Sequence, residues 1–96
     1  MGRKQVISKF SGMTIDMDYM LCIPSIHALY GEEEEAVIDY GGEIRRRSSR
    51  FPDAKIKLLK RWIAKHRKEI EKNHQKCGHD EYPLDPIKPL RLILKD

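Results

Sequence analysis

Four histidines and two cysteines are the residues of this 96-residue chain best suited to chemistry. An imidazole titrates near neutral pH, which makes His27 a candidate proton shuttle. His74 and Cys77 are three residues apart and share one face of a predicted helix, with His79 just beyond, so these three are candidate zinc ligands. A structural zinc site would need a second spaced pair of ligands, and the only further candidate is the single residue Cys22. We therefore expect neither a metal nor another cofactor.

No familiar catalytic pattern accompanies these residues. The sequence contains no glycine-rich phosphate loop, no nucleophile elbow and no spaced pair of catalytic carboxylates. Asp16 and Asp18 point to the same side of a predicted strand, as two solvent-exposed acids commonly do. A single histidine in a strand, such as His27, is also typically structural. These features favour a binding protein over an enzyme.

The distribution of charge is more informative than its total. Residues 45–76 contain thirteen Lys/Arg and three Asp/Glu, a net of +10, whereas residues 1–44 have a net of −5 and residues 77–96 a net of −1, which together give the net charge of +4. Such asymmetry attracts polyanions or acidic protein surfaces to one end of a molecule.

The basic residues form a pattern within this segment. Six of them recur along a predicted helix at steps of three and four, within about 100° of arc and opposite the apolar stripe. Four arginines precede that helix. We expect the binding surface to consist of Arg45, Arg46, Arg47, Arg50, Lys57, Arg61, Lys65, Lys68 and Lys72, with Lys76 at its end. The alternative is an ordinary solvated helix face. No aromatic residue interrupts the ladder, so stacking on single-stranded bases is poorly supported.

A run of four glutamates, Glu32 to Glu35, offers a second explanation of the charge pattern. These carboxylates could pair with the basic helix of another copy, which would give a homodimer held by charge complementarity. Alternatively, the run is a solvated turn.

The first half of the chain alternates between polar and apolar residues, with turn residues in between. This period of two, together with Ser11-Gly12 and Gly41-Gly42, predicts antiparallel strands joined by tight turns. The expected strands are Val6–Phe10, Met13–Tyr19, Ser25–Tyr30, Ala36–Tyr40 and Glu43–Arg47.

The period then changes to that of a helix. Pro52 suits the first helical position, and Gly78 could end the helix in the left-handed conformation. The apolar face of this helix comprises Ile56, Leu59, Ile63, His66 and Ile70. Three prolines favour extended chain after it, with a last edge strand over Leu90–Leu94.

These elements predict one α+β domain spanning residues 1–96. A strand-rich part (6–47) forms an antiparallel meander of about five short strands, one long amphipathic helix (about 52–77) packs on it, and residues 79–96 form an extended, Pro-rich tail. The helix needs the sheet because an isolated helix of this size is marginal in water.

The expected location is the cytoplasm. No apolar run approaches the ~20 residues of a membrane span, and the basic N-terminus is not followed by the apolar core of a signal peptide. Two cysteines, Cys22 and Cys77, are too few for a disulfide framework, so we expect reduced thiols.

Several short motifs follow one another in a recognisable order. They read Phe10-Ser11-Gly12, Ile15-Asp16-Met17, Pro24-Ser25-Ile26-His27-Ala28-Leu29-Tyr30-Gly31, Glu35-Ala36-Val37-Ile38, Trp62 with His66-Arg67 and Asn73, and Ile87-Lys88-Pro89-Leu90. With these motifs the chain resembles, over roughly residues 6–90, the bacterial family described as domain of unknown function 4160. The family's Pro-His-Phe-His segment has one histidine fewer here, because Ser25 takes the place of the first.

The resemblance implies a partner rather than a reaction. The family has no established activity, and its genes often neighbour another small open reading frame, in an arrangement similar to toxin–antitoxin pairs. This implies a small protein partner, and RNA or DNA by analogy. We therefore expect a cytoplasmic, bacterial interaction module that binds a small protein or a nucleic-acid backbone through its basic helix face. The alternative is a small ribonuclease-like toxin in which His27 moves the proton and nearby arginines stabilise phosphate charge.

Overall fold

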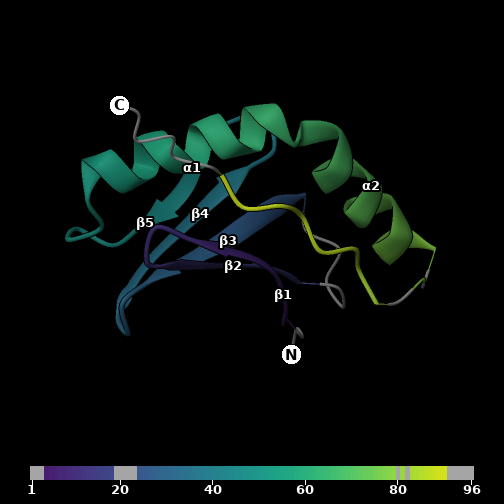
Figure 1. The fold of residues 1–96 in the computed structure, drawn as a ribbon, viewed down its shortest axis with the longest axis horizontal. Coiled ribbons are helices and arrows are strands. Elements are labelled where there is room, and N and C mark those ends of the chain that lie inside the picture. Colours follow the sequence, from purple (N-terminus) through teal and green to yellow (C-terminus); the bar gives the residue numbers. More distant parts are fainter. Residues whose placement is uncertain (1–3, 19–23, 80, 82, 91–96) are drawn as a thin grey trace.

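The chain folds as a five-stranded antiparallel sheet followed by two helices. The computed structural model describes residues 4–18, 24–79, 81 and 83–90. The elements are β1 (Lys4–Phe10), β2 (Met13–Asp18), β3 (Ser25–Tyr30), β4 (Glu34–Asp39), β5 (Ile44–Arg47), α1 (Asp53–Lys65) and α2 (Arg67–Gly78). The strands lie side by side in chain order, and both helices lie on one side of the sheet (Figure 1). The α+β meander that the sequence predicts is confirmed.

The β1–β2 hairpin shows how local sequence sets the topology. Ser11 and Gly12 both have positive φ, 51° and 77°, as the two central residues of a tight hairpin turn require. Phe10 pairs with Met13 on either side of this turn. Further along β1 the register shifts between Val6 and Ser8, so the strand contains a bulge.

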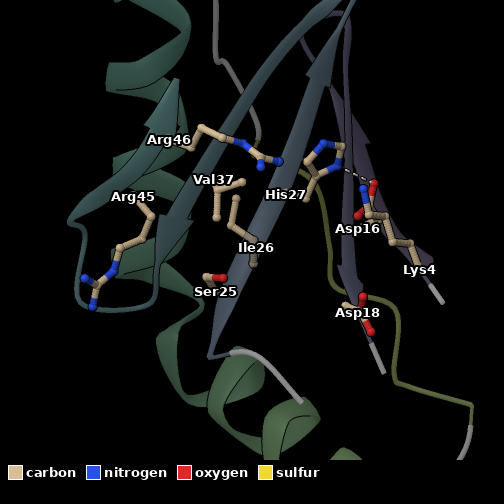
Figure 2. Close-up of a pocket in the computed structure, with 9 residues that line it drawn as sticks. All are labelled: Lys4, Asp16, Asp18, Ser25, Ile26, His27, Val37, Arg45 and Arg46. Carbon is tan, nitrogen blue, oxygen red and sulfur yellow. Dashed lines mark hydrogen bonds and ion pairs between the residues drawn. The ribbon is translucent and has the colours of Figure 1, made fainter. Parts of the chain in front are cut away.

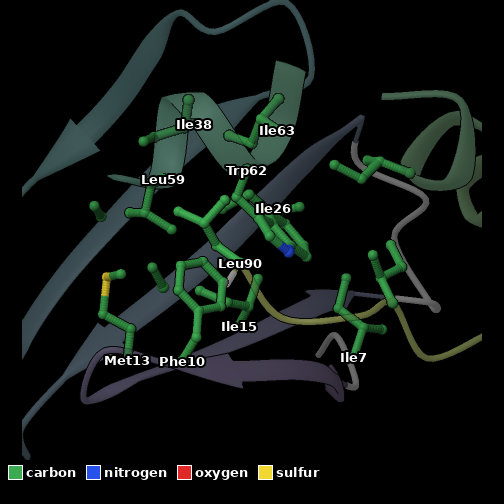
Figure 3. Close-up of a cluster of buried hydrophobic side chains, with 14 of the residues drawn as sticks. Ile7, Phe10, Met13, Ile15, Ile26, Ile38, Leu59, Trp62, Ile63 and Leu90 are labelled. Carbon is green, nitrogen blue, oxygen red and sulfur yellow. The ribbon is translucent and has the colours of Figure 1, made fainter. Parts of the chain in front are cut away.

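The core lies between the sheet and the helices. One side of each central strand and one face of α1 contribute apolar side chains that meet in a single cluster (Figure 3). The cluster includes Ile15, Ile26, Ile38, Leu59, Trp62 and Ile63, all almost fully buried. In the described part of the chain, no helix covers the other side of the sheet, and that open face carries polar residues of the alternating strands.

The single helix that we expected over residues 52–77 is interrupted. His66 has φ −111° and ψ 21°, which separates α1 from α2, and the chain bends at this point (Figure 1). Hydrogen bonding continues through the bend, because the His66 N–H donates to the Trp62 carbonyl and the His66 carbonyl accepts from the Ile70 N–H. The bend keeps Ile63 and Ile70, on opposite sides of it, buried in the same core.

The helix also ends differently from our expectation. Gly78 is the last residue of α2, but it is not among the positive-φ glycines of the described residues. The left-handed termination is therefore wrong, and the next N–H, that of His79, closes the helix by donating to the Gln75 and Lys76 carbonyls.

The C-terminal segment after the helices is an integral part of the core. Leu84, Ile87 and Leu90 are buried, and the segment runs between the helices and β1 (Figure 1). The Ile87 N–H donates to the Ile7 carbonyl at 2.8 Å. Leu90 lies outside any strand, and residues 91–94 of the expected edge strand lie outside the described residues.

Two side-chain amides hold this segment by its backbone. The Asn73 amide donates to the Asp85 carbonyl at 2.9 Å and accepts from the Asp85 N–H at 2.8 Å. The Gln5 amide makes the same pair of bonds with Leu84, at 2.7 and 2.8 Å. The Trp62 indole N–H donates a further hydrogen bond to a backbone carbonyl of the same segment. The segment is thus attached to both layers.

The expectation of reduced thiols is wrong for Cys77, which is disulfide-bonded. Cys22 lies outside the described residues. Reduced thiols were one reason to expect a cytoplasmic location, and this reason no longer holds. The cytoplasmic location stays a prediction. Within the part of the chain that the structure describes, neither helix is long and apolar enough to cross a membrane.

Candidate functional site

The first candidate site is the outer face of the two helices. We call its six basic residues the cation ladder: Lys57, Arg61, Lys65, Lys68, Lys72 and Lys76. All are exposed except Lys76, which is partly buried. The last two rungs are partly neutralised, because the ammonium nitrogens of Lys72 and Lys76 lie 4.0 and 3.1 Å from the Asp85 carboxylate. Among the described residues, the side chains of the first four rungs make no hydrogen bond or ion pair, although the charge of Lys57 also acts on the Asp53 carboxylate.

The four arginines before α1 behave differently from the ladder. Arg45 lies 3.2 Å from Asp39 and 3.5 Å from Glu43. Arg47 donates to the Phe51 carbonyl and to the Asp53 carboxylate. Local acids therefore offset these two cations.

Arg46 lies apart from the ladder. The Arg46 guanidinium lies 4.0 Å from Glu35 and lines a cleft on the open face of the sheet, so it is on the side away from the helices. Arg50 is exposed in the segment between β5 and α1. The structure thus separates Arg46 from the ladder, whereas Arg47 and the first rung, Lys57, both act on Asp53.

The second candidate site lies on the open face of the sheet and centres on His27. Asp16 of β2 lies directly opposite His27 of β3, and Glu35 lies two residues along β4 from the partner of His27. The His27 Nδ1 is 2.9 Å from the Asp16 Oδ2, and its Nε2 is 2.7 Å from the Glu35 Oε1. The imidazole therefore bridges two carboxylates from the strands on either side (Figure 2 shows the Asp16 bond).

The environment of these groups favours a charged imidazole. The hydrogen bond to Asp16 raises the pKa of His27 above its ordinary 6.5; burial opposes this rise, and the Glu35 bond adds to it. The bond from His27 in turn lowers the pKa of Glu35. As an imidazolium, His27 donates from both nitrogens, one to each carboxylate.

Asp16 is the residue that sequence reasoning misjudged. We expected an ordinary exposed acid, yet Asp16 is only 7% exposed. Its second oxygen, Oδ1, is buried and has no hydrogen-bond partner among the described residues. The sequence placed Glu35 in the glutamate run and in a family motif, but did not indicate its contact with His27. The available signal was the alternation, which places Asp16 and His27 on the same side of neighbouring strands, but the pairing register was needed to join them.

A cleft of about 330 Å³ adjoins His27 on this face. Basic groups from both edges of the sheet and acidic groups from β2 face it (Figure 2). It is lined by Lys4, Asp16, Asp18, Ser25, Ile26, His27, Val37, Arg45 and Arg46. The lining combines opposite charges with a small apolar wall.

The candidate metal ligands do not form a site in the described part of the chain. The His74 ring lies 6.1 Å from the Tyr40 ring, Cys77 is disulfide-bonded, and His79 is exposed. Among the described residues, no group of three or more His, Cys, Asp or Glu side chains is placed to hold a metal ion.

These features define a small α+β protein in which two helices cover one side of an antiparallel meander. The other side of the sheet is open and carries acidic side chains, basic side chains and the His27 imidazole. The model of the family described as "Domain of unknown function (DUF4160)" matches residues 19–75, more than half of the chain. The chain belongs to this family, as the motifs predict. The matched range contains His27, Glu35 and all but the last rung of the cation ladder, whereas Asp16 precedes it. Comparison with curated proteins and with solved structures gives no significant match.

Proposed function

We propose that the protein is a cytoplasmic, bacterial interaction module that binds the phosphate backbone of a nucleic acid through the cation ladder. The observation that carries this proposal is that Lys57, Arg61, Lys65 and Lys68 are exposed and that their side chains form no ion pair among the described residues. Cations that are free of intramolecular ion pairs release counterions from phosphates when they bind, which supplies most of the affinity of backbone contacts.

The surroundings of the ladder favour contacts with the backbone over contacts with bases. Trp62, the one tryptophan of the chain, lies within the same helix but is fully buried, so its ring is not available for stacking on a single strand. Double-stranded RNA or DNA presents a continuous array of phosphates and suits a surface that offers only charge. A duplex is thus the ligand that this helix face fits best.

The first test is binding of a fluorescent 20-base-pair duplex, measured by anisotropy at low salt. We expect the double variant Arg61→Glu with Lys65→Glu to abolish binding. The matched comparison uses single reversals, Lys65→Glu on the ladder and Lys9→Glu on β1. Both replace an exposed lysine and change the net charge equally, so only the first should weaken binding. Equal weakening by the two would mean that net charge alone matters and would overturn the proposal.

A small acidic protein is the other partner that such a surface could attract, in keeping with the toxin–antitoxin-like gene arrangement of the family. A native pull-down from the source cell, analysed for protein and nucleic acid, separates the two. The pull-down could recover a protein, without nucleic acid, that the charge-reversed ladder no longer captures. That protein, and not a duplex, would then be the partner.

The ribonuclease-like alternative receives less support from the site. In the described structure both ring nitrogens of His27 already contact carboxylates, those of Asp16 and Glu35. A general base needs a free nitrogen that can accept the proton of the attacking hydroxyl. Under the binding function, His27→Ala leaves affinity for the duplex intact and the purified protein does not cut RNA. Cleavage that His27→Ala stops would favour the toxin instead.

A further inference from the structure

The Glu35 carboxylate lies beside the cleft on the open sheet face, next to His27 and Arg46, two basic residues that line the cleft. Its Oε1 lies 2.7 Å from the His27 Nε2 and 4.0 Å from the Arg46 guanidinium. The positive charge of Lys4 also acts on Glu35 and on His27. His27 of β3 and Arg46 of β5 therefore lie beside the Glu35 carboxylate of β4, and the charge of Lys4 of β1 acts on it as well.

The place beside His27 and Arg46 has the chemistry of an anion site whose present occupant belongs to the chain itself. Asp16 engages the Nδ1 of His27, which leaves the Nε2–H directed at whatever anion lies beside it. Arg46 is exposed and, among the described residues, makes only the long contact with Glu35, so most of its five donors remain available. Glu35 itself is 44% exposed on its side chain and can turn outward into solvent.

We propose that the cleft binds a phosphomonoester of mononucleotide size, whose phosphate takes the place of the Glu35 carboxylate on His27 and Arg46. A phosphate dianion offers three acceptor oxygens and pairs with a guanidinium in bidentate fashion, so it can engage both donors more fully than one carboxylate oxygen does.

The remainder of the cleft suits the rest of such a ligand. Its volume of about 330 Å³ is at the lower end of the range for small-molecule pockets. Val37, which pairs with His27 across β3 and β4, gives the cleft an apolar side chain against which a base can pack. This site is separate from the cation ladder, which lies on the opposite side of the sheet.

Isothermal titration of the full chain with uridine 5′-monophosphate at pH 7 tests the proposal, with inorganic phosphate and uridine as partial ligands. We expect saturable binding of the nucleotide, at least tenfold tighter than that of either part. Arg46→Gln should weaken nucleotide binding at least tenfold. Glu35→Gln, which removes the competing carboxylate charge, should tighten it severalfold.

Two control variants localise the binding. Arg50→Gln makes the same substitution at a nearby exposed arginine that is not among the residues lining the cleft, and it should change affinity less than twofold. Arg61→Glu with Lys65→Glu should leave nucleotide binding unchanged, so that failure of the cleft and failure of the ladder are distinguishable. Circular dichroism of each variant verifies that it is folded.

Lack of saturable binding both in the natural chain and in Glu35→Gln overturns the proposal, as does nucleotide binding that Arg46→Gln leaves intact. Inorganic phosphate that binds as tightly as the nucleotide, with the same response to Arg46→Gln and Glu35→Gln, supports the phosphate site and overturns its extension to a nucleoside.

Discussion

The Nδ1 of His27 lies 2.9 Å from the Oδ2 of Asp16 across the β2–β3 pairing, and this contact organises the open face of the sheet. Asp16 is buried and its other oxygen has no hydrogen-bond partner among the described residues. A buried carboxylate is costly unless it is paired, and His27 provides this pairing for Asp16. The same bond orients the ring so that its other nitrogen meets Glu35.

The first prediction concerns the pKa of His27. Asp16→Asn replaces the carboxylate by a neutral amide of similar shape and removes the main cause of the raised pKa. We expect the pKa of His27 to fall, as measured by NMR titration of its ring protons. Asp18→Asn, on the same strand, is the control and should have a smaller effect. An unchanged pKa in Asp16→Asn would contradict the assigned role of this contact.

The second prediction is the dependence of stability on pH. The pKa of His27 is higher in the folded chain than its ordinary 6.5, so the folded state holds the proton more tightly than the unfolded state does. This stabilisation is fully present below the ordinary pKa and is lost as pH rises through the folded value. The melting temperature should therefore fall over that window, and His27→Gln should flatten the fall. A melting temperature that rises there would contradict the prediction.

At lower pH the sign is reversed because Glu35, Asp39 and Asp53 have lowered pKa values. Their stabilisation is present above the ordinary carboxyl pKa and is lost as these groups are protonated. The melting temperature should thus also fall as pH decreases through about 4, near the ordinary pKa of carboxyl groups. Glu35→Gln should reduce this acid-side fall.

The third prediction concerns the salt dependence of duplex binding. Four unpaired rungs of the ladder should give a log–log slope of about −3.6, because each phosphate contact contributes about −0.9 on B-form DNA. Lys65→Glu should make the slope shallower by about one contact, whereas Lys9→Glu should leave it unchanged. Anisotropy titrations between low and physiological salt measure both slopes, and a flat slope for the natural chain would exclude the ladder as a backbone-binding surface.

The fourth prediction tests how the C-terminal segment is held. Asn73→Ala removes both hydrogen bonds to the Asp85 backbone and should lower the free energy of unfolding by about 1–3 kcal/mol, the usual cost of leaving buried polar groups unpaired. Gln75→Ala, at an exposed position of the same helix, should change it by less than about 0.5 kcal/mol. Urea denaturation gives both values. Equal stabilities of the two variants would show that the segment is held by other contacts.

The fifth prediction compares two glycines. Gly12 has φ +77°, and an added Cβ would lie 3.3 Å from the Tyr30 ring. Gly12→Ala should therefore destabilise the fold by about 1–2 kcal/mol. Gly78 has no neighbour within 4 Å of an added Cβ and no positive φ, so Gly78→Ala should be neutral or slightly stabilising. Thermal or urea unfolding of the two variants measures the difference, and a stabilising Gly12→Ala would contradict the turn geometry.

Local patterns in the sequence were sufficient to predict the secondary-structure elements and their order. Alternation and turn residues predicted all five strands, with Ser25–Tyr30 matching β3 at both ends, and the helical period predicted which face of the helix is buried. These features depend on neighbours within a few residues, such as the positive φ at Gly12. The bend at His66 was not predictable, because nothing in the period of the apolar residues changes there.

Only the tertiary structure decided which charges remain free. Strand register placed Asp16 and Glu35 on either side of His27, and the fold paired Arg45 and Arg47 with acids while it left Lys57, Arg61, Lys65 and Lys68 unpaired among the described residues. Sequence alone determined the number of charges and the helix face on which the ladder lies. Whether a charge is buried, paired or exposed depends on contacts between residues distant in the chain, and these arise when the sheet and helices pack together.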